Sequence, residues 1–254
     1  MDRWLNQIIQ GDCLDIMREL PDKSVDMILC DLPYGTTACK WDTIIPFEPL
    51  WEQYKRLIKP NGAIVLTASQ PFTSMLVMSN PKWFKYEWIW DKKKSSGALN
   101  ADVAPLKVHE NILVFGEGRT TYNKQMRQGK PRVDKPNLIP NGDIRQDKST
   151  VLRGYKNEQG LYNPVSILEI SNANQQSKEH PTQKPVALFE YLIKTYTDPG
   201  EIVLDNCIGS GTTAVAALNT GRFFIGIEKE PKYAEIARKR LEQAQAQQSL
   251  FGTM

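Results

Sequence analysis

The sequence predicts an α/β protein with a doubly wound, mostly parallel β-sheet. Short apolar runs of strand length alternate along the chain with segments whose apolar residues recur at helical spacing. Two of the runs, 63–67 and 202–204, are continuously apolar, as is typical of strands buried on both faces of a parallel sheet. Because crossovers between parallel strands usually carry helices, helices should cover both faces of this sheet.

Local signals place the individual elements. Turn-forming residues at 21–24 and 59–62 separate neighbouring elements, and residues 47–58 carry apolar side chains on one side of a helix. The expected strands are 4–9, 25–30, 63–67, 83–90, 111–115, 202–204 and 223–227, and the expected helices are 14–20, 47–58, 71–78, 186–196, 212–218 and one from Pro231 onward.

The composition excludes several classes of protein. Apolar residues make up 41% and charged residues 24% of the 254-residue chain, which is ordinary for a globular protein. No stretch approaches the roughly 18 uninterrupted apolar residues of a membrane span, and residues 1–4 do not open a signal peptide. We therefore expect a cytoplasmic protein without a membrane partner. The four cysteines show no C-x-x-C spacing and only two histidines are present, so reduced thiols are expected and a metal centre is not.

A basic, irregular segment interrupts the pattern at 116–178. It holds eleven Lys and Arg against six Asp and Glu, a net charge of +5, whereas the rest of the chain has 21 against 23. The segment is too long for a passive connection, so we expect an inserted module that binds a polyanion, with a solvated loop as the alternative. The predicted organisation is a catalytic domain at 1–115 and 179–246, the insert at 116–178, and a flexible tail at 247–254.

The loop Asp31-Leu32-Pro33-Tyr34-Gly35 follows an apolar strand, which is where ligands bind in open α/β sheets. A carboxylate only accepts hydrogen bonds, a residue before proline displays its carbonyl, and a tyrosine ring offers a stacking face. Asp31 and the Leu32 carbonyl could bind both N–H groups of an amine on a planar ring and aim its lone pair at an electrophile. An ordinary β-turn is the alternative, since these residues are also common in turns.

A glycine-rich bend forms a second candidate site near the other end of the chain. It follows strand 202–204 and reads Asp205-Asn206-Cys207-Ile208-Gly209-Ser210-Gly211-Thr212. Glycines let the backbone approach a ligand, and Glu228 at the end of the next strand could bind a ribose diol. The glycine spacing also matches a dinucleotide fingerprint, but only 26 residues follow Glu228. The remaining strands of a nucleoside-binding half must then come from the start of the chain.

The order of these motifs resembles that of amino-methyltransferases that modify DNA, in the circularly permuted beta class. It is carried by the Asp31 loop, then a basic variable region, then His180-Pro-Thr-Gln-Lys-Pro185, and then the glycine loop. The resemblance covers nearly all of residues 6–242 outside the insert. It implies the Rossmann-like fold of methyltransferases that use S-adenosylmethionine, with 116–178 as the target-recognition region.

The resemblance also implies a cofactor site. Asp205, Gly209 and Gly211, with the adjoining Asn206 and Thr212, would line the S-adenosylmethionine pocket. Glu228 would hold the ribose, Asp12 would lie near the adenine, and Thr182 and Lys184 would lie near the methionine end, where an ammonium facing a carboxylate is favourable. The sequence departs from the usual Asp-Pro-Phe at Asp205-Asn206-Cys207, and Leu32 stands where proline is more frequent.

The resulting hypothesis is a site-specific DNA methyltransferase, of the kind found in restriction-modification systems, that methylates N6 of a flipped-out adenine. Asp31, Leu32, Pro33 and Tyr34 would form its catalytic loop, with Tyr34 stacking on the base. An Asp at the first loop position leans toward adenine in the resembling class, whereas Ser leans toward cytosine. Cytosine N4 is the nearest alternative, followed by an RNA methyltransferase, a nucleotide-dependent oxidoreductase and a non-catalytic DNA-binding module.

Further partners are expected besides double-stranded DNA. The resembling class often forms dimers. The residues from Gln247 to Phe251, Gln-x-Ser-Leu-Phe, resemble the peptide by which bacterial replication proteins bind the sliding clamp, with a frayed tail as the alternative. Lys92, Lys93 and Lys94 form either an exposed cationic turn or a phosphate contact for DNA.

Overall fold

A computed structural model describes residues 1–36, 42–96, 101–133, 156–172 and 183–251 of the chain. The chain divides into two compact units. The first comprises Met1–Asn123 and Ser166–Met254, and the second comprises Lys124–Val165. None of the described helices is long and apolar enough to cross a membrane.

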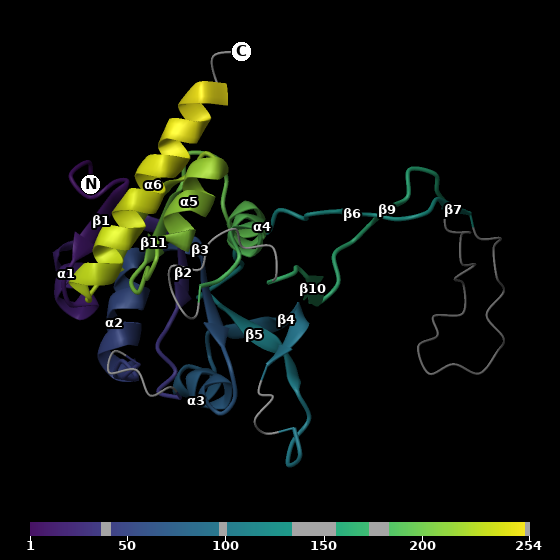
Figure 1. The fold of residues 1–254 in the computed structure, drawn as a ribbon, viewed down its shortest axis with the longest axis horizontal. Coiled ribbons are helices and arrows are strands. Elements are labelled where there is room, and N and C mark those ends of the chain that lie inside the picture. Colours follow the sequence, from purple (N-terminus) through teal and green to yellow (C-terminus); the bar gives the residue numbers. More distant parts are fainter. Residues whose placement is uncertain (37–41, 97–100, 134–155, 173–182, 252–254) are drawn as a thin grey trace. The chain divides into compact units, whose positions relative to one another are not determined.

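The first unit is built on one eight-stranded, mostly parallel sheet (Figure 1). Only β5 runs against its neighbours, pairing antiparallel with both β3 and β4. In spatial order the strands are β1 (Gln7–Gln10), β12 (Phe223–Glu228), β11 (Ile202–Asp205), β2 (Val25–Asp31), β3 (Ile58–Ala68), β5 (Lys107–Phe115), β4 (Phe84–Ser96) and β10 (Ile167–Glu169).

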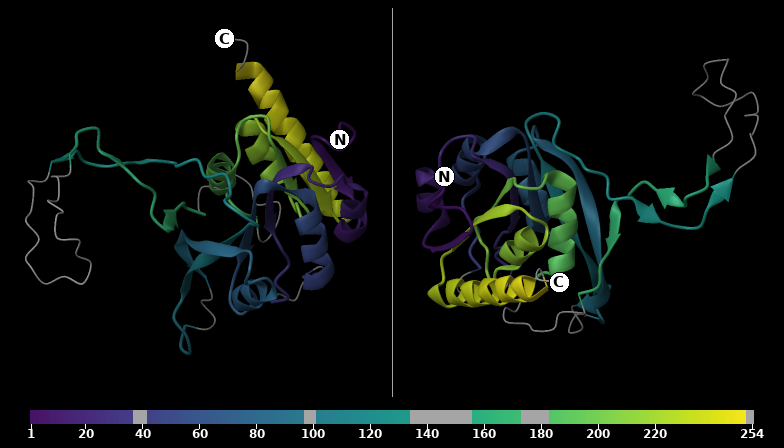
Figure 2. Two further views of the ribbon diagram at one scale, coloured as in Figure 1. Left: turned by 180° about the vertical axis from the view of Figure 1, so that it is seen from behind. Right: turned by 90° about the horizontal axis from the view of Figure 1, so that it is seen from above.

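Helices cover both faces of this sheet, so the doubly wound α/β fold is confirmed (Figure 1 and Figure 2). One face packs against α1 (Cys13–Glu19), α2 (Phe47–Leu57) and α3 (Phe72–Ser79). The other packs against α4 (Val186–Tyr196), α5 (Thr212–Asn219) and α6 (Pro231–Phe251). The apolar runs are continuous because alternate residues of one strand serve opposite faces: in β2, Met27 and Leu29 face the α4–α6 layer, and Ile28 and Cys30 face the α1–α3 layer.

Segments from the two ends of the chain share the sheet. β1 pairs with β12, and β2 pairs with β11, both in parallel. The loop after β2 therefore lies beside the loop after β11, although 174 residues separate Asp31 from Asp205 along the chain. This is the arrangement that the permuted motif order predicts.

Several boundaries differ from the prediction. The hairpin strands β4 and β5 extend through polar residues, because backbone pairing continues where the apolar pattern has ended. The short strand β10 was not predicted. It lies within the predicted insert, 116–178, and it pairs in parallel with β4 at the edge of the sheet. The second unit therefore spans Lys124–Val165 rather than 116–178. At the other end, α6 continues to Phe251, so residues 247–251 are helical where a tail was predicted.

The second unit contains short strands in its described part. β6 (Arg127–Gln128) pairs with β9 (Leu161–Tyr162), and β7 (Arg132–Val133) pairs with β8 (Lys156–Asn157), both antiparallel. The described side chains of this unit are mostly exposed. The assignment of this unit as a target-recognition module stays a prediction.

Gly211 caps α5 with a left-handed backbone (φ 84°), and a Cβ there would lie 3.0 Å from Cβ of Ala237 in α6. Replacing Gly211 with Ala should therefore add a steric clash with α6 to the cost of the left-handed conformation, roughly 1–2 kcal/mol for the backbone and about 1–3 kcal/mol for the overpacking. Gly200 is the matched control, since its φ is 83° and nothing lies within 4 Å of its Cβ position. Urea unfolding should show a larger loss for Gly211→Ala than for Gly200→Ala; equal losses would contradict the close packing.

Candidate active site

The carboxyl ends of four adjacent parallel strands place polar side chains along one edge of the sheet. Glu228 ends β12, Asp205 ends β11 and Asp31 ends β2, and Thr67 pairs with Asp31 near the end of β3. Ligands bind at this edge in open α/β sheets. The two loops that the sequence singled out therefore lie at one site.

The Asp31 carboxylate is the centre of a hydrogen-bond network. Its Oδ1 accepts a hydrogen bond from the Tyr34 hydroxyl at 2.8 Å and another from the Thr67 hydroxyl. Its Oδ2 forms an ion pair with Nζ of Lys184 at 2.6 Å. The Tyr34 ring stacks on Phe72 with centroids 5.2 Å apart. Tyr34 is thus tied to Asp31 through its hydroxyl, a role that the sequence did not predict.

The raised pKa values of Tyr34 and Lys184 mean that both side chains stay protonated in this network. Burial, followed by the neighbouring Asp31 carboxylate, raises the pKa of Tyr34, so its hydroxyl stays a hydrogen-bond donor. For Lys184, burial opposes the charge, but the carboxylates of Asp31 and Glu110 outweigh it and raise the pKa of the ammonium. Lys184 is therefore a buried cation.

The segment that carries Lys184 is docked on the glycine loop. The Thr212 hydroxyl donates to the backbone carbonyl of Lys184 at 3.3 Å, and the Ser210 hydroxyl donates to Oε1 of Gln183 at 3.2 Å. Arg240 of α6 in turn donates to the Ser210 hydroxyl oxygen at 2.8 Å. The glycine loop and the Asp31 loop are thus linked through Lys184. The predicted contribution of Thr182 lies outside the described residues.

Asp205 is a buried acid with an unusual pKa. Burial raises the pKa of Asp205 to about 7, although hydrogen bonds from the Thr213 hydroxyl and the Cys207 amide act in the opposite direction. The side chain of the next residue, Asn206, accepts a hydrogen bond from the Tyr54 hydroxyl at 2.6 Å in the core. The side chain of Asn206 is therefore held by α2, and its role in cofactor binding stays a prediction.

Glu228 and Asp12 lie on neighbouring segments, because β1 pairs with β12. The Glu228 carboxylate accepts hydrogen bonds from the amides of Gly209 at 2.8 Å and Glu230 at 2.9 Å. Its backbone carbonyl accepts one from Gly11, the neighbour of Asp12. Asp12 itself caps α1 through the Leu14 amide at 3.0 Å, so part of its accepting capacity serves the helix. Glu228 fixes the glycine loop and retains lone pairs for a ligand hydroxyl.

Three cysteines from distant parts of the sequence gather beside Asp205. The thiols of Cys13 and Cys30 both lie within hydrogen-bonding reach of Cys207. All three are free, and burial raises the pKa of Cys30 to about 12. In the described part of the chain, no cluster of His, Cys, Asp or Glu is arranged to hold a metal ion. Cys30 is buried in the core between the sheet and the α1–α3 layer, and Cys207 packs against it as a partly buried side chain.

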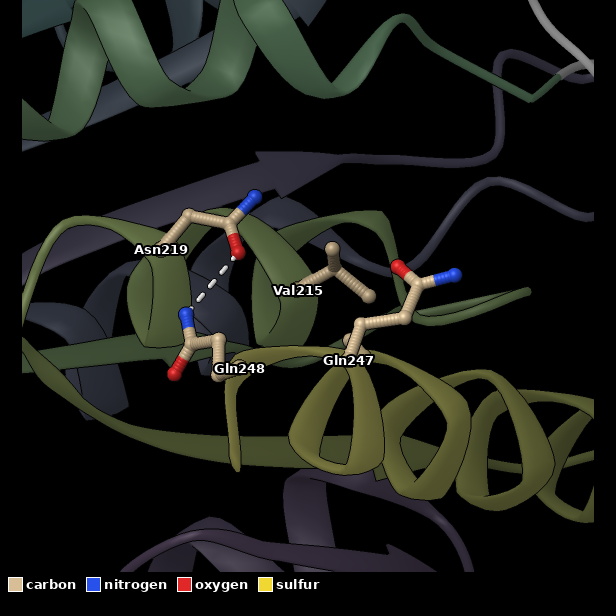
Figure 3. A pocket seen from close by; sticks show the side chains of 5 residues that line it. Val215, Asn219, Gln247 and Gln248 are labelled. Atoms are coloured by element: carbon tan, nitrogen blue, oxygen red, sulfur yellow. Dashed lines mark hydrogen bonds between the residues drawn. The ribbon is translucent and has the colours of Figure 1, made fainter. Parts of the chain in front are cut away.

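A hollow elsewhere on the first unit lacks this chemistry. It lies between α5 and α6 and is lined by Val215, Asn219, Ala244, Gln247 and Gln248 (Figure 3). The Gln248 amide donates to the Asn219 side-chain oxygen at 3.2 Å across it. None of its lining side chains is ionisable, so the edge that carries Asp31 and Asp205 remains the better candidate for a reaction.

The donor set at the sheet edge suits S-adenosylmethionine. This cofactor carries an ammonium, a sulfonium and a ribose diol, and the edge offers the buried carboxylates of Asp205 and Glu228 together with glycine-loop backbone. Carboxylates and helix-end amides are the groups expected around such a ligand. The fold and this edge define a methyltransferase that uses S-adenosylmethionine.

Comparisons with known proteins agree. A family model for DNA methylases, named N6_N4_Mtase, matches residues 25–239. The type II methyltransferase M.HpaI of Haemophilus parainfluenzae is 28% identical over 252 residues, which cover 93% of this chain and 74% of the relative. The protein belongs to the N6_N4_Mtase family of DNA methylases, which are S-adenosylmethionine-dependent amino-methyltransferases.

Solved structures show the same fold. The M1.HpyAVI complex with S-adenosylmethionine is 27% identical, with a TM-score of 0.61 and coverage of 92% of this chain and 99% of that one. TTHA0409 of Thermus thermophilus, also complexed with S-adenosylmethionine, is 20% identical with a TM-score of 0.58, covering 94% and 95%. The cytosine-N4-specific PvuII methyltransferase is 15% identical with a TM-score of 0.64, covering 95% and 93%. The last two show a likeness of fold alone.

The raised pKa of Asp205 predicts how the free energy of unfolding changes with pH. Its folded pKa, about 7, exceeds its ordinary value of 3.8, so the folded state favours the protonated form. That contribution is complete below the unfolded pKa and is lost as the pH rises through the folded pKa. Asp205→Asn should therefore become more stable relative to wild type, by a few kcal/mol at most, between about pH 4 and about pH 8. Urea unfolding at both pH values measures this, with exposed Asp15→Asn as the control. A difference that does not change with pH would contradict it.

Proposed function

We propose that the protein transfers a methyl group to N6 of an adenine that is flipped out of double-stranded DNA. The observation that carries the proposal is the Asp31 carboxylate at the end of β2, joined by Lys184 to the glycine loop that follows β11. Asp31 occupies the first loop position, where Asp leans toward adenine in the resembling class. Because chromosomal DNA would be the substrate, we place the activity in the cytoplasm.

The chain's own groups would position the target amine. Asp31 and the Leu32 carbonyl would accept its two N–H groups, which orients the nitrogen lone pair. The Leu32 side chain is buried, and Pro33 restricts the backbone of Leu32 to an extended conformation. Both features fix the position of the Leu32 carbonyl. Tyr34, already backed by Phe72 on one side, would stack on the base. Cytosine N4 is the second candidate, since its amine suits the same acceptor pair.

The cofactor would lie along the adjoining strand ends. When bound, S-adenosylmethionine supplies an electrophilic methyl group on a sulfonium, so positioning and electrostatics are what the protein has to add. Asp205 and the backbone of Gly209 and Gly211 would line its pocket, with Glu228 at the ribose and Asp12 near the adenine. Lys184 and Thr182 would lie toward the methionine end, and Thr212 would hold Lys184 in place through its carbonyl, as it does here.

DNA recognition is assigned to the second unit and its surroundings. Residues 124–165 carry nine Lys and Arg against four Asp and Glu, which suits a phosphate backbone. The lysine run at 92–94 offers fewer free charges for DNA phosphates than the sequence suggested. Lys92 is buried and pairs with Glu110, and Lys93 pairs with Asp91 and Glu169, which leaves Lys94 as the exposed member for which no ion pair is described.

Two further partners stay within the proposal. A homodimer is proposed from the resemblance to the permuted class, and binding of a sliding clamp is proposed from the likeness of residues 247–251 to clamp-binding peptides. Because α6 extends to Phe251 and Gln248 is hydrogen bonded to Asn219, a clamp-binding peptide would first have to leave the helix. In a restriction-modification system, the methylation would protect DNA from cleavage by a cognate nuclease.

The test of the function is expression in a methylation-free host, followed by modification-sensitive sequencing of its DNA. N6-methyladenine at a defined sequence is the expected product. Asp31→Asn should lower methylation at least about 100-fold, since it removes the charged acceptor of the amine, and should leave S-adenosylmethionine binding intact. Asp15→Asn, at an exposed position of α1, is the matched control. N4-methylcytosine would move the assignment to the second candidate, and neither base, from folded protein, would contradict both.

Glu228 provides a separate test of the cofactor site. Glu228→Gln should weaken S-adenosylmethionine binding about tenfold or more, because the neutral amide is a poorer acceptor for ribose hydroxyls and for the Gly209 amide. Glu230→Gln, two residues away and half-buried, should bind normally. Calorimetry with S-adenosylmethionine, and with NAD as the competing ligand, measures both. Equal affinities of the two variants would remove Glu228 from the site.

A further inference from the structure

Four charged side chains form a chain of ion pairs at the carboxyl ends of the strands, in which the two lysines are buried and the two carboxylates are partly exposed. Nζ of Lys184 lies 2.6 Å from Oδ2 of Asp31 and 3.4 Å from Oε2 of Glu110. Nζ of Lys92 lies 3.3 Å from Oε1 of Glu110. Lys92 and Lys184 are 8% and 6% exposed, so two cations and two anions share a poorly solvated space.

The topology of the sheet brings Glu110 to this place. β5 is antiparallel to β3, so the start of β5 reaches the edge at which β2 and β3 end. The register pairs Thr67 of β3 with Ile112 and Trp90 of β4 with Glu110. Glu110 therefore lies just past the end of β3, opposite the loop that carries Asp31.

The Asp31 carboxylate has reduced capacity to accept hydrogen bonds from a target amine while it keeps its present partners. Its Oδ1 already accepts hydrogen bonds from Tyr34 and Thr67, and its Oδ2 is held by the Lys184 ammonium. A cation bound at 2.6 Å competes with an uncharged amine for the same oxygen and reduces the charge that the amine meets. Binding of the amine favours a state in which Lys184 has another partner.

Glu110 offers that partner. Among the described residues, no donor forms a hydrogen bond with its buried Oε2. An unsatisfied buried carboxylate oxygen is costly, and this one is already within ion-pair distance of the Lys184 ammonium. The other oxygen is held by Lys92, which fixes the direction of the carboxylate. A small rotation of the Lys184 side chain would exchange one carboxylate for the other.

We propose that Glu110 is a positioning residue that takes the Lys184 ammonium from Asp31 when the target amine binds. This rests on the proposed function of Asp31. No bond forms or breaks and no proton moves in the exchange; one ion pair replaces another, and Oδ2 of Asp31 is released to accept an N–H group. Glu110 acts through Lys184 and does not touch the base.

The test is the single-turnover rate of methyl transfer from labelled S-adenosylmethionine to genomic DNA of a methylation-free host. Glu110→Gln should lower this rate at least about tenfold, the factor that corresponds to a charge-assisted hydrogen bond, with unchanged cofactor affinity. Glu169→Gln is the matched control, because it removes a carboxylate that pairs with Lys93 on the same part of the sheet at an exposed position. The proposal is overturned if Glu110→Gln transfers the methyl group at the wild-type rate. It is also overturned if the variant's loss of rate is matched by an equal loss of affinity for S-adenosylmethionine.

Two more variants separate positioning from packing. Glu110→Asp keeps the carboxylate and should recover part of the lost rate. Lys92→Met removes the group that orients Glu110 but keeps the carboxylate and its contact with Lys184, so the rate should stay close to that of wild type. This comparison with wild type stands even where Glu110→Gln fails to fold. A rate for Lys92→Met as low as that of Glu110→Gln would show a general packing role and overturn the proposal. An inactive wild-type enzyme would instead contradict the proposed function.

Discussion

The ion pair between Asp31 and Lys184 joins the two halves of the site. Asp31 belongs to the first part of the chain, whereas Lys184 follows the insert, and their charged atoms are 2.6 Å apart. Thr212 holds the backbone of Lys184 against the start of α5, so the loop after β11 is positioned relative to the loop after β2. A methyl donor on one loop and an acceptor on the other need this alignment, because small displacements of reacting groups cost large factors in rate.

The sheet makes that alignment available. Four parallel strands end at one edge and supply Glu228, Asp205, Asp31 and Thr67, and the single antiparallel strand among the eight delivers Glu110 to the same edge from the opposite direction. A fully parallel sheet would place the start of β5 at the far edge. The reversal of one strand thus adds a carboxylate next to the Asp31 loop, and the adjoining β4 adds the cation Lys92, which pairs with that carboxylate.

The sequence predicted the parts of this site that short motifs encode. The Asp31 loop and the glycine loop each combine a buried strand with turn residues over a few positions, and such local patterns can be recognised without a structure. Thr67 and Glu110 could not be found in this way, because their role depends on strand pairing between distant segments. The same limit explains the misjudged lengths of β4 and β5. Asn206 lay in a recognised motif, but its partner Tyr54 is 152 residues away.

The buried charges are better explained by function than by stability. Removing two cations and two carboxylates from water costs several kcal/mol per ion, and apolar side chains of similar volume often stabilise a fold equally well or better. The Lys184 ammonium has three N–H donors, and it lies between the carboxylates of Asp31 and Glu110 at 2.6 and 3.4 Å. In the proposed exchange, the second carboxylate within ion-pair distance gives this cation an alternative partner. That property stabilises nothing by itself, but it lets Asp31 change between a partner of Lys184 and an acceptor for a substrate amine.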